Sequence, residues 1–201
     1  MRILFAVVLS YLFGSIPWAL IVGKVFYHKD IRKEGSGNLG GTNAGRVLGK
    51  KAGISVTLLD GFKAFIAMAL CALWAPEAMI YAGLAVCVGH CFPVFAQFRG
   101  GKAVATSFGF FLGISVFLTH QIFWQFFFEV ICFFAILYVC RMVSLSSLLS
   151  LAVGVLMSFV LKNDLSVSLA EIALLLFVTY RHRENIARIR NGTEKKVKWM
   201  G

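Results

Sequence analysis

Long apolar blocks, nearly free of charge, follow one another along the chain and restrict the folds that it can adopt. A helix needs about 20 predominantly apolar residues to cross a bilayer core of ~30 Å. The blocks are Ile3–Gly23, Ala52–Ala75, Ala78–Phe98, Val104–Thr119, Ile122–Cys140, Val143–Leu161 and Leu165–Tyr180. Membrane-spanning β-barrels instead need short alternating segments. The sequence therefore predicts an all-α polytopic membrane protein of about seven transmembrane helices.

The basic residues predict how these helices are oriented. With the N-terminus outside, the segments 24–51, 99–102, 141 and 181–201 lie on the inner side and hold 17 of the 20 Lys and Arg. The positive-inside rule favours this orientation, with a cytoplasmic C-terminus. The outer connections are only a few residues long. We therefore expect one domain, residues 1–201, in the inner (plasma) membrane, whose first block is an uncleaved span rather than a signal peptide.

The first inner loop, Gly35–Arg46, is dense in glycine and carries Ser, Asn, Thr and Arg. Three of its glycines match the dinucleotide fingerprint, but that motif requires a preceding strand, and here an apolar helix precedes. Glycine N–H groups approach anions closely, and Arg46 can grip a phosphate with two hydrogen bonds. The sequence favours an anion site; the alternative is a solvated flexible loop.

The second inner segment places Gly100-Gly101-Lys102 directly before the block that starts at Val104. Free N–H groups and the positive end of the helix dipole favour phosphate there. Ala103 stands where a Walker A loop has its metal-binding Ser or Thr, so we expect a phosphate ester rather than a magnesium nucleotide. The alternative is a tight turn with a snorkelling lysine.

Two further segments carry histidines. His90, in Gly89–Pro93, is about ten residues from Gly100, or ~15 Å if the segment is helical, and Pro93 can kink that helix and free a backbone carbonyl. An ionisable group at membrane depth is often functional, and the alternative is a helix-packing histidine. His182 and Asn185 lie three apart on one predicted helical face of a basic tail, which otherwise indicates an amphipathic lipid anchor.

A few polar residues fall inside the apolar blocks. Asp60 and Lys63 are three apart and predict an ion pair, and Gln125 and Glu129 are four apart on another block. Together with Glu171 they are interpreted as structural ties. The five cysteines are interpreted as packing residues, and no metal or cofactor is predicted.

Taken together, these segments resemble the bacterial glycerol-3-phosphate acyltransferases that use acyl phosphate as donor. That family carries Gly-Ser-Gly-Asn-x-Gly-Ala-Thr-Asn, matched by residues 35–43 except Gly41 for Ala. It carries Gly-His-x-Phe-Pro and Gly-Gly-Lys-Gly-Val-Ala-Thr, matched by residues 89–93 and 100–106 except Ala103 for Gly. The family's His-x-x-Asn-Ile-x-Arg and Gly-x-Glu match residues 182–194. The resemblance covers nearly the whole chain.

The resemblance implies transfer of an acyl group to the 1-hydroxyl of glycerol 3-phosphate, giving lysophosphatidic acid and phosphate on the cytoplasmic side. The implied partners are glycerol 3-phosphate, acyl phosphate, membrane lipid and the soluble enzyme that makes acyl phosphate, with no nucleic acid. The implied catalytic residues are Ser36, His90, Lys102, His182 and Asn185. The implied substrate-binding residues are Gly37, Asn38, Thr42, Asn43, Arg46, Gly100, Gly101, Thr106, Arg188, Gly192 and Glu194.

Mechanistic alternatives remain open at this level. Arg46 and Lys102 suit the phosphates, the base is His90, His182 or the donor's phosphate, and Ser36 lacks an evident triad for a nucleophile. Two rival functions are a carrier of phosphorylated metabolites, which usually shows internal repeats, and an alcohol phosphotransferase. Asp60-Gly61 hints at the acidic motif of the latter, whose further aspartates are missing nearby.

Overall fold

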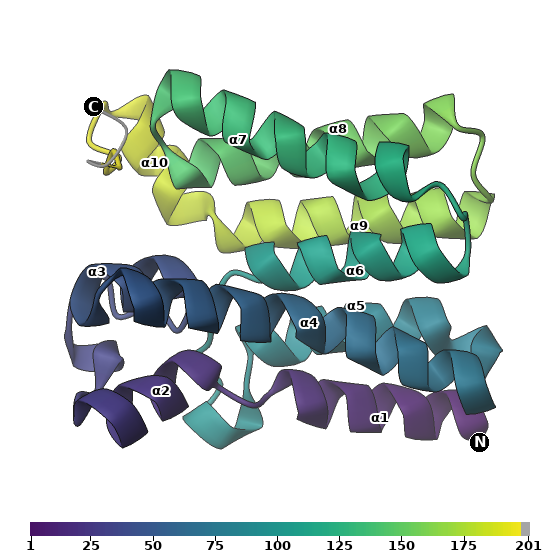
Figure 1. Ribbon diagram of the computed structural model, residues 1–201, viewed down its shortest axis with the longest axis horizontal. Helices are drawn as coiled ribbons and strands as arrows, with labels where there is room; N and C mark the ends of the chain where they lie inside the picture. The colour runs from purple at the N-terminus through teal and green to yellow at the C-terminus, as the bar shows by residue number, and fades with distance from the viewer. Residues whose placement is uncertain (198–201) are drawn as a thin grey trace. The chain divides into compact units, whose positions relative to one another are not determined.

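The computed structural model describes residues 1–197 of the protein, and within them every regular element is helical, as predicted (Figure 1). The longer elements are α1 (Arg2–Gly14), α2 (Trp18–Tyr27), α3 (Gly41–Leu48), α4 (Lys50–Trp74), α5 (Met79–Cys91), α6 (Val104–Phe117), α7 (Phe128–Cys140), α8 (Val143–Val160), α9 (Leu165–Arg181) and α10 (Arg183–Arg190). The short ones are the 3-10 turns η1 (Ile31–Lys33), η2 (Pro76–Ala78) and η3 (Val94–Ala96) and the π-helix η4 (Phe123–Phe127).

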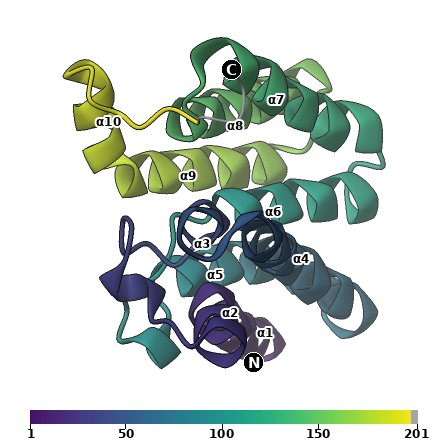
Figure 2. The same cartoon turned by 60° about the vertical axis from the view of Figure 1, so that its left-hand side comes forward.

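The chain divides into two compact units, and the boundary falls within α6, after Gly113. In the first unit α1, α4 and α5 pack side by side, and α2 and α3 pack against α4 (Figures 1 and 2). A Cβ on Gly14 would meet the backbone of Val86, so α1 and α5 approach at a distance that only glycine allows. Small residues at such crossings are typical of helices packed in a membrane. That the chain forms one domain stays a prediction.

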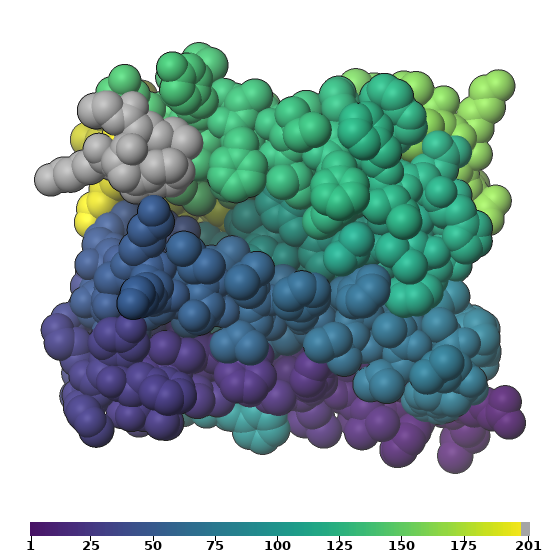
Figure 3. All heavy atoms as spheres, viewed as in Figure 1, coloured from purple at the N-terminus to yellow at the C-terminus, as the bar shows by residue number. Residues whose placement is uncertain are grey.

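Helix α4 exposes apolar side chains on one face and buries two charged side chains on the other. Its buried face carries Asp60 and Lys63, each no more than 2% exposed. Its outward stripe recurs every three or four residues and consists of Ile54, Leu58, Phe62, Ile66, Leu70 and Leu73, all exposed. Figure 3 shows the face of the unit on which α4 lies at the surface. An exposed apolar stripe of this length suits contact with lipid rather than water.

The first apolar block is broken, contrary to the prediction of one continuous helix. Helix α1 ends at Gly14, and α2 begins at Trp18 after an irregular link that contains Pro17. Proline has no N–H to donate and its ring clashes with the preceding turn, so the helix ends before it and restarts after it. The carbonyl of Ile16 lies outside the regular helical bonds and accepts from the Trp18 N–H at 3.1 Å.

The second unit packs α7 on α8 and α8 on α9, and α10 contacts both α8 and α9. Inside it, Gln125 Nε2 donates to Glu171 Oε1 at 2.7 Å, and Asn163 Nδ2 donates to Gln125 Oε1 at 2.7 Å. The bonded partner of Gln125 is thus Glu171 rather than Glu129, four residues along the chain. Gln125 lies in the π-helix η4, whose wider turn changes the direction of its side chains relative to an α-helix.

Five helical segments of the described chain are long and apolar enough to cross a membrane: residues 2–27, 50–74, 76–96, 123–140 and 143–160. A sixth is the pair α9 and α10, bent by 63° at their junction. The remaining predicted span, α6, is apolar but has only 14 residues. Five or six spans therefore meet the criterion, and seven stays a prediction.

Candidate active site

The first inner loop is held in shape by one buried side chain. Asn43, 1% exposed, accepts a hydrogen bond from the Ser36 N–H at 2.8 Å through its Oδ1. Its Nδ2 donates to the carbonyls of Ile31 and Glu34, both at 3.2 Å. The amide of Asn43 is thus bonded to the backbone on both sides. We assign Asn43 to the folding of this loop, whereas Ser36 lies exposed at its tip.

The loop leads into α3, which begins at Gly41 and exposes Thr42 and Arg46. A Cβ on Gly41 would collide with Thr57 Oγ1 of α4. The departure from the family's alanine at this position therefore fits the close packing of α3 on α4. Asn38 is half-buried and Gly37 adopts a left-handed φ of 70° that glycine tolerates.

A cavity of about 310 Å³ lies where the first and second inner segments meet. Its lining consists of Asp30, Arg32, Lys33, Gly37, Gln97 and Arg99. Arg32 grips Asp30 with bonds of 2.7 and 2.9 Å, and this hydrogen bonding lowers the pKa of Asp30 to about 2. Three cations against one carboxylate leave the lining positive, which suits a phosphate ligand.

The second segment folds back on His90 instead of continuing the helix. Helix α5 ends at Cys91, and Pro93 follows its end, so the proline terminates the helix rather than kinking it. The N–H of Gly101 donates to the His90 carbonyl at 3.0 Å. The separation of ~15 Å applies only to a continuous helix, and here the turn through η3 reverses the chain instead.

Lys102 lies half-buried directly before α6, as predicted from the diglycine. Ala103, where the family pattern has glycine, adopts a left-handed φ of 58°. A residue with a Cβ holds that conformation at a cost of about 1–2 kcal/mol. Thr106, one turn into α6, is fully buried and its Oγ1 makes no hydrogen bond within the described residues.

The predicted pairing of Asp60 with Lys63 is confirmed. Lys63 Nζ lies 2.9 Å from Asp60 Oδ1, and His90 Nδ1 lies 3.4 Å from the same oxygen. His90 itself is 7% exposed. This histidine is therefore part of a buried charged cluster in the first unit.

The tail of the second unit is organised around Glu194. Its carboxylate accepts from Ser144 Oγ at 2.7 Å, Asn185 Nδ2 at 2.6 Å and Arg188 Nε at 2.8 Å. Burial raises the pKa of Glu194, but these hydrogen bonds outweigh it and hold the pKa below its ordinary value. Gly192, with φ of 68°, lets the chain turn back after α10 so that Glu194 reaches these donors.

His182 lies at the bend between α9 and α10 (Figure 2), where its Nδ1 is 2.8 Å from the Val178 carbonyl. It precedes α10, and Asn185 lies in the first turn of that helix. The chain bends by 63° at this point, so His182 is the N-cap of α10 and precedes Asn185 by three residues. Both side chains are buried. Lys198, counted with the basic tail, lies outside the described residues.

Comparison with known proteins identifies the family. The model of the glycerol-3-phosphate acyltransferase family matches residues 4–192. The chain belongs to this family. A glycerol-3-phosphate acyltransferase of Geobacillus kaustophilus is 48% identical over 96% of this chain and 95% of its own, and one of Macrococcus caseolyticus is 42% identical over 99% of each.

Solved structures agree with the family assignment. A crystal structure of PlsY (YgiH), an integral membrane glycerol 3-phosphate acyltransferase, in its glycerol 3-phosphate form has a TM-score of 0.89 at 34% identity. The match covers 98% of this chain and 96% of that one. The lysophosphatidic acid form of the same protein has a TM-score of 0.87.

The acyltransferase residues predicted from the sequence fall into two groups. The first unit holds Ser36, Gly37, Asn38, Thr42, Asn43, Arg46, His90, Gly100, Gly101, Lys102 and Thr106. The second holds His182, Asn185, Arg188, Gly192 and Glu194. Sequence reasoning counted Arg32, Lys33 and Arg99 only as inner charges. Their gathering around one cavity depends on η1 meeting the turn after η3, and no local pattern signals it.

Proposed function

We propose that this acyltransferase moves an acyl group from acyl phosphate to the 1-hydroxyl of glycerol 3-phosphate, forming lysophosphatidic acid and inorganic phosphate. The observation that carries the proposal is the positive cavity of about 310 Å³, whose lining includes Arg32, Lys33 and Arg99 beside Gly37 of the first inner loop. Both substrates carry a phosphate, and the relatives' names and the glycerol 3-phosphate form of PlsY support the acceptor.

In the proposed reaction the acceptor hydroxyl attacks the donor's carbonyl carbon. The new ester bond forms as the bond to the phosphate oxygen breaks, phosphate leaves, and the hydroxyl proton passes to a base. The leaving group is already a weak base, so the protein's tasks are to neutralise phosphates, align the reactants and stabilise the oxyanion. Lys102 and Arg46 suit the phosphates, and glycine N–H groups with Ser36 or Asn38 suit the oxyanion.

The proposal assigns proton removal to His182 or to the donor's own phosphate. His90 is less suited, because its Nδ1 lies 3.4 Å from Asp60 Oδ1 and its Nε2 lies against Gly101. A covalent intermediate on Ser36 would require an adjacent base. Direct transfer predicts intersecting double-reciprocal lines, whereas parallel lines or a trapped acyl-Ser36 adduct would contradict it.

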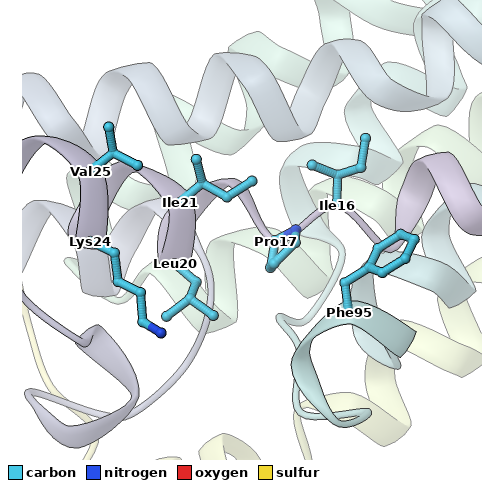
Figure 4. A pocket seen from close by; sticks show the side chains of 7 residues that line it. All are labelled: Ile16, Pro17, Leu20, Ile21, Lys24, Val25 and Phe95. Atoms are coloured by element: carbon cyan, nitrogen blue, oxygen red, sulfur yellow. The ribbon is translucent and has the colours of Figure 1, made fainter.

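The apolar groove at the break between α1 and α2 suits an acyl chain. It has a volume of about 360 Å³ and is lined by Ile16, Pro17, Leu20, Ile21, Lys24, Val25 and Phe95. In Figure 4, Leu20 and Lys24 lie to one side of Pro17, whereas Phe95, which comes from η3, lies to the other side. Apolar walls with a single cation fit a chain whose headgroup is anionic. Leu20→Trp, which narrows the groove, should shift chain-length preference toward shorter acyl phosphates.

We further propose seven spans in the plasma membrane, with an outer N-terminus and with the segments 24–51 and 99–102 and the tail in the cytoplasm. The bias of Lys and Arg supports this orientation. Cysteines introduced at Ser36 and Lys196 should resist an impermeant thiol reagent in intact cells. Labelling of either from outside would overturn the orientation.

The direct test replaces the proposed phosphate ligands. Lys102→Ala and Arg46→Ala should each lower kcat/KM roughly tenfold to a hundredfold, since each loses a charge-assisted bond of about 1.5–3 kcal/mol. Lys162→Ala removes an exposed cation outside the site and is the matched control. Near-wild-type values for both site variants would refute the phosphate-binding role.

The donor and the rival functions are separated by one assay of the purified protein. Acyl phosphate should be consumed with formation of lysophosphatidic acid, and acyl-CoA should not be used. A carrier would give no acyl transfer, and an alcohol phosphotransferase would require a divalent metal and a nucleotide-linked lipid instead. Comparable turnover with acyl-CoA would contradict the proposed donor.

A further inference from the structure

The break between α1 and α2 is closed by a buried lysine from another helix. Lys63 Nζ, on α4, donates to the carbonyl of Gly14 at 3.1 Å and to that of Ile16 at 2.5 Å. Its side chain is 1% exposed. The C-terminal end of α1 is the negative end of the helix dipole, so the ammonium is favourable there. Lys63 thus fixes the position of the break.

The charge of Lys63 is compensated one turn away on the same helix. Asp60 Oδ1 lies 2.9 Å from Lys63 Nζ and 3.4 Å from His90 Nδ1 on α5. The three side chains are each at most 7% exposed. A buried charge costs several kcal/mol unless it is paired. Removing one of the three side chains should therefore destabilise the arrangement of the other two.

The imidazole of His90 in turn lies against the phosphate-binding loop. A Cβ on Gly101 would collide with His90 Nε2, and one on Gly100 would collide with the His90 carbonyl. The Gly101 N–H donates to that carbonyl at 3.0 Å. The ring and carbonyl of His90 therefore set where the backbone of Gly100 and Gly101 lies, and Lys102 follows directly.

We infer that Asp60 and Lys63 are positioning residues for acyl transfer, acting through His90 on the loop that presents Lys102. The inference rests on the proposed function of that loop. Lys63 anchors the cluster to the α1–α2 break, Asp60 orients the imidazole, and the imidazole supports the diglycine. In this arrangement His90 is itself a positioning residue rather than the base.

The inference predicts a specific kinetic pattern. Asp60→Asn keeps the shape and an oxygen acceptor for Lys63 but removes the charge that holds His90. It should raise KM for glycerol 3-phosphate and lower kcat/KM about tenfold to a hundredfold, as expected for a misplaced phosphate ligand. Glu129→Gln, a buried acid of the second unit, is the matched control and should leave both parameters near wild type.

Whether Asp60 acts through His90 is tested by combining the changes. The double variant Asp60→Asn with His90→Gln should lose no more kcat/KM than the worse single variant, since both cut the same chain of contacts. Losses that multiply, or a change in stability with kcat/KM retained per folded molecule, would overturn the inference. An inactive wild type would instead contradict the proposed function.

A second measurement does not depend on activity or on the folding of Asp60→Asn. Amide exchange at Gly101 should be faster in His90→Gln than in wild type, whereas exchange in α8 should be unchanged. Unchanged exchange at Gly101 would mean that the imidazole does not support the loop, and the inference would fail.

Discussion

In the first unit, Asp60, Lys63 and His90 bury opposite charges side by side, whereas the second unit buries the two carboxyls of Glu129 and Glu171 with no cation at hand in the bonds described. Glu171 accepts from Gln125, but neither oxygen of Glu129 makes a hydrogen bond within residues 1–197. The two regions are equally inaccessible, with Lys63 and Glu129 both 1% exposed.

The difference separates an ion-paired cluster from two carboxyls that have no counter-ion in the contacts described. Removing one member of a paired cluster leaves an uncompensated charge and is costly, whereas removing an unpaired buried group loses little. Burial alone therefore does not tell which intramembrane residues matter.

The largest effect is expected at Lys63. Lys63→Met should lower the free energy of unfolding by about 3–5 kcal/mol, because it removes the lysine partner of the buried Asp60 carboxylate and the side-chain donor to two carbonyls. Unfolding of the purified protein in detergent measures this. A stability equal to wild type would show that the cluster is not held together by charge.

A smaller effect is expected at Glu194, a paired carboxylate outside the spans. Glu194→Gln should weaken the local stability of α10 by about 1.5–3 kcal/mol, since three donors lose a charged acceptor. Amide exchange across α10 is the measurement, with Glu184→Gln on its exposed face as control. Equal exchange in both variants would contradict the central role of Glu194.

The same carboxylate predicts a pH dependence. Because the pKa of Glu194 is lowered in the folded state, its stabilisation is complete above the ordinary value of 4.5 and is lost as pH falls through the folded value. Protection of α10 should therefore decline at acid pH in wild type. In Glu194→Gln that part of the decline should disappear.

A slightly smaller effect than at Glu194 is expected at Gln125, whose side-chain amide links polar groups of the second unit. Gln125→Leu removes the donor to Glu171 and the acceptor of Asn163, and should cost about 1–3 kcal/mol of unfolding free energy. Gln125→Glu, which keeps the acceptor but not the donor, shows which of the two bonds matters more. Wild-type stability in both would mean that neither does.

The smallest effect is expected at Glu129. Glu129→Gln breaks no hydrogen bond seen within the described chain, so stability should change by no more than about 0.5 kcal/mol. A loss comparable to that of Lys63→Met would erase the distinction between the two clusters and point to a partner for Glu129.

Much of the fold follows from hydropathy. The block Val143–Leu161 corresponds to α8 (Val143–Val160), and α6 begins at Val104 as expected. The break after Gly14 was missed because Ile16 and Trp18 are as apolar as the helices around them. Pro17 was the only local signal. Hydropathy indicates whether a segment lies in lipid or in water, but it does not show where the helix axis changes direction.

The sequence predicts which segments carry the candidate site, but not the hydrogen bonds that join side chains of distant segments. The motifs locate the loops, and the ion pair of Asp60 with Lys63 follows from helical spacing. That Asn43 ties its own loop together, or that Glu194 gathers Ser144, Asn185 and Arg188, depends on contacts between distant segments. The resemblance implies that Asn43 and Glu194 bind substrate, which stays a prediction, and their hydrogen bonds show that each also shapes its own segment.

The groove beside Pro17 opens at the surface of its unit, where Val25 and Phe95 are about 60% exposed. A donor that enters such a groove is supplied from the bilayer, so its effective concentration is a mole fraction among lipids rather than an amount per volume of water. Inert lipid added at constant total substrate would then dilute the donor in two dimensions and slow the reaction. The concentration of the soluble acceptor, which is dissolved in water, would not change on adding lipid.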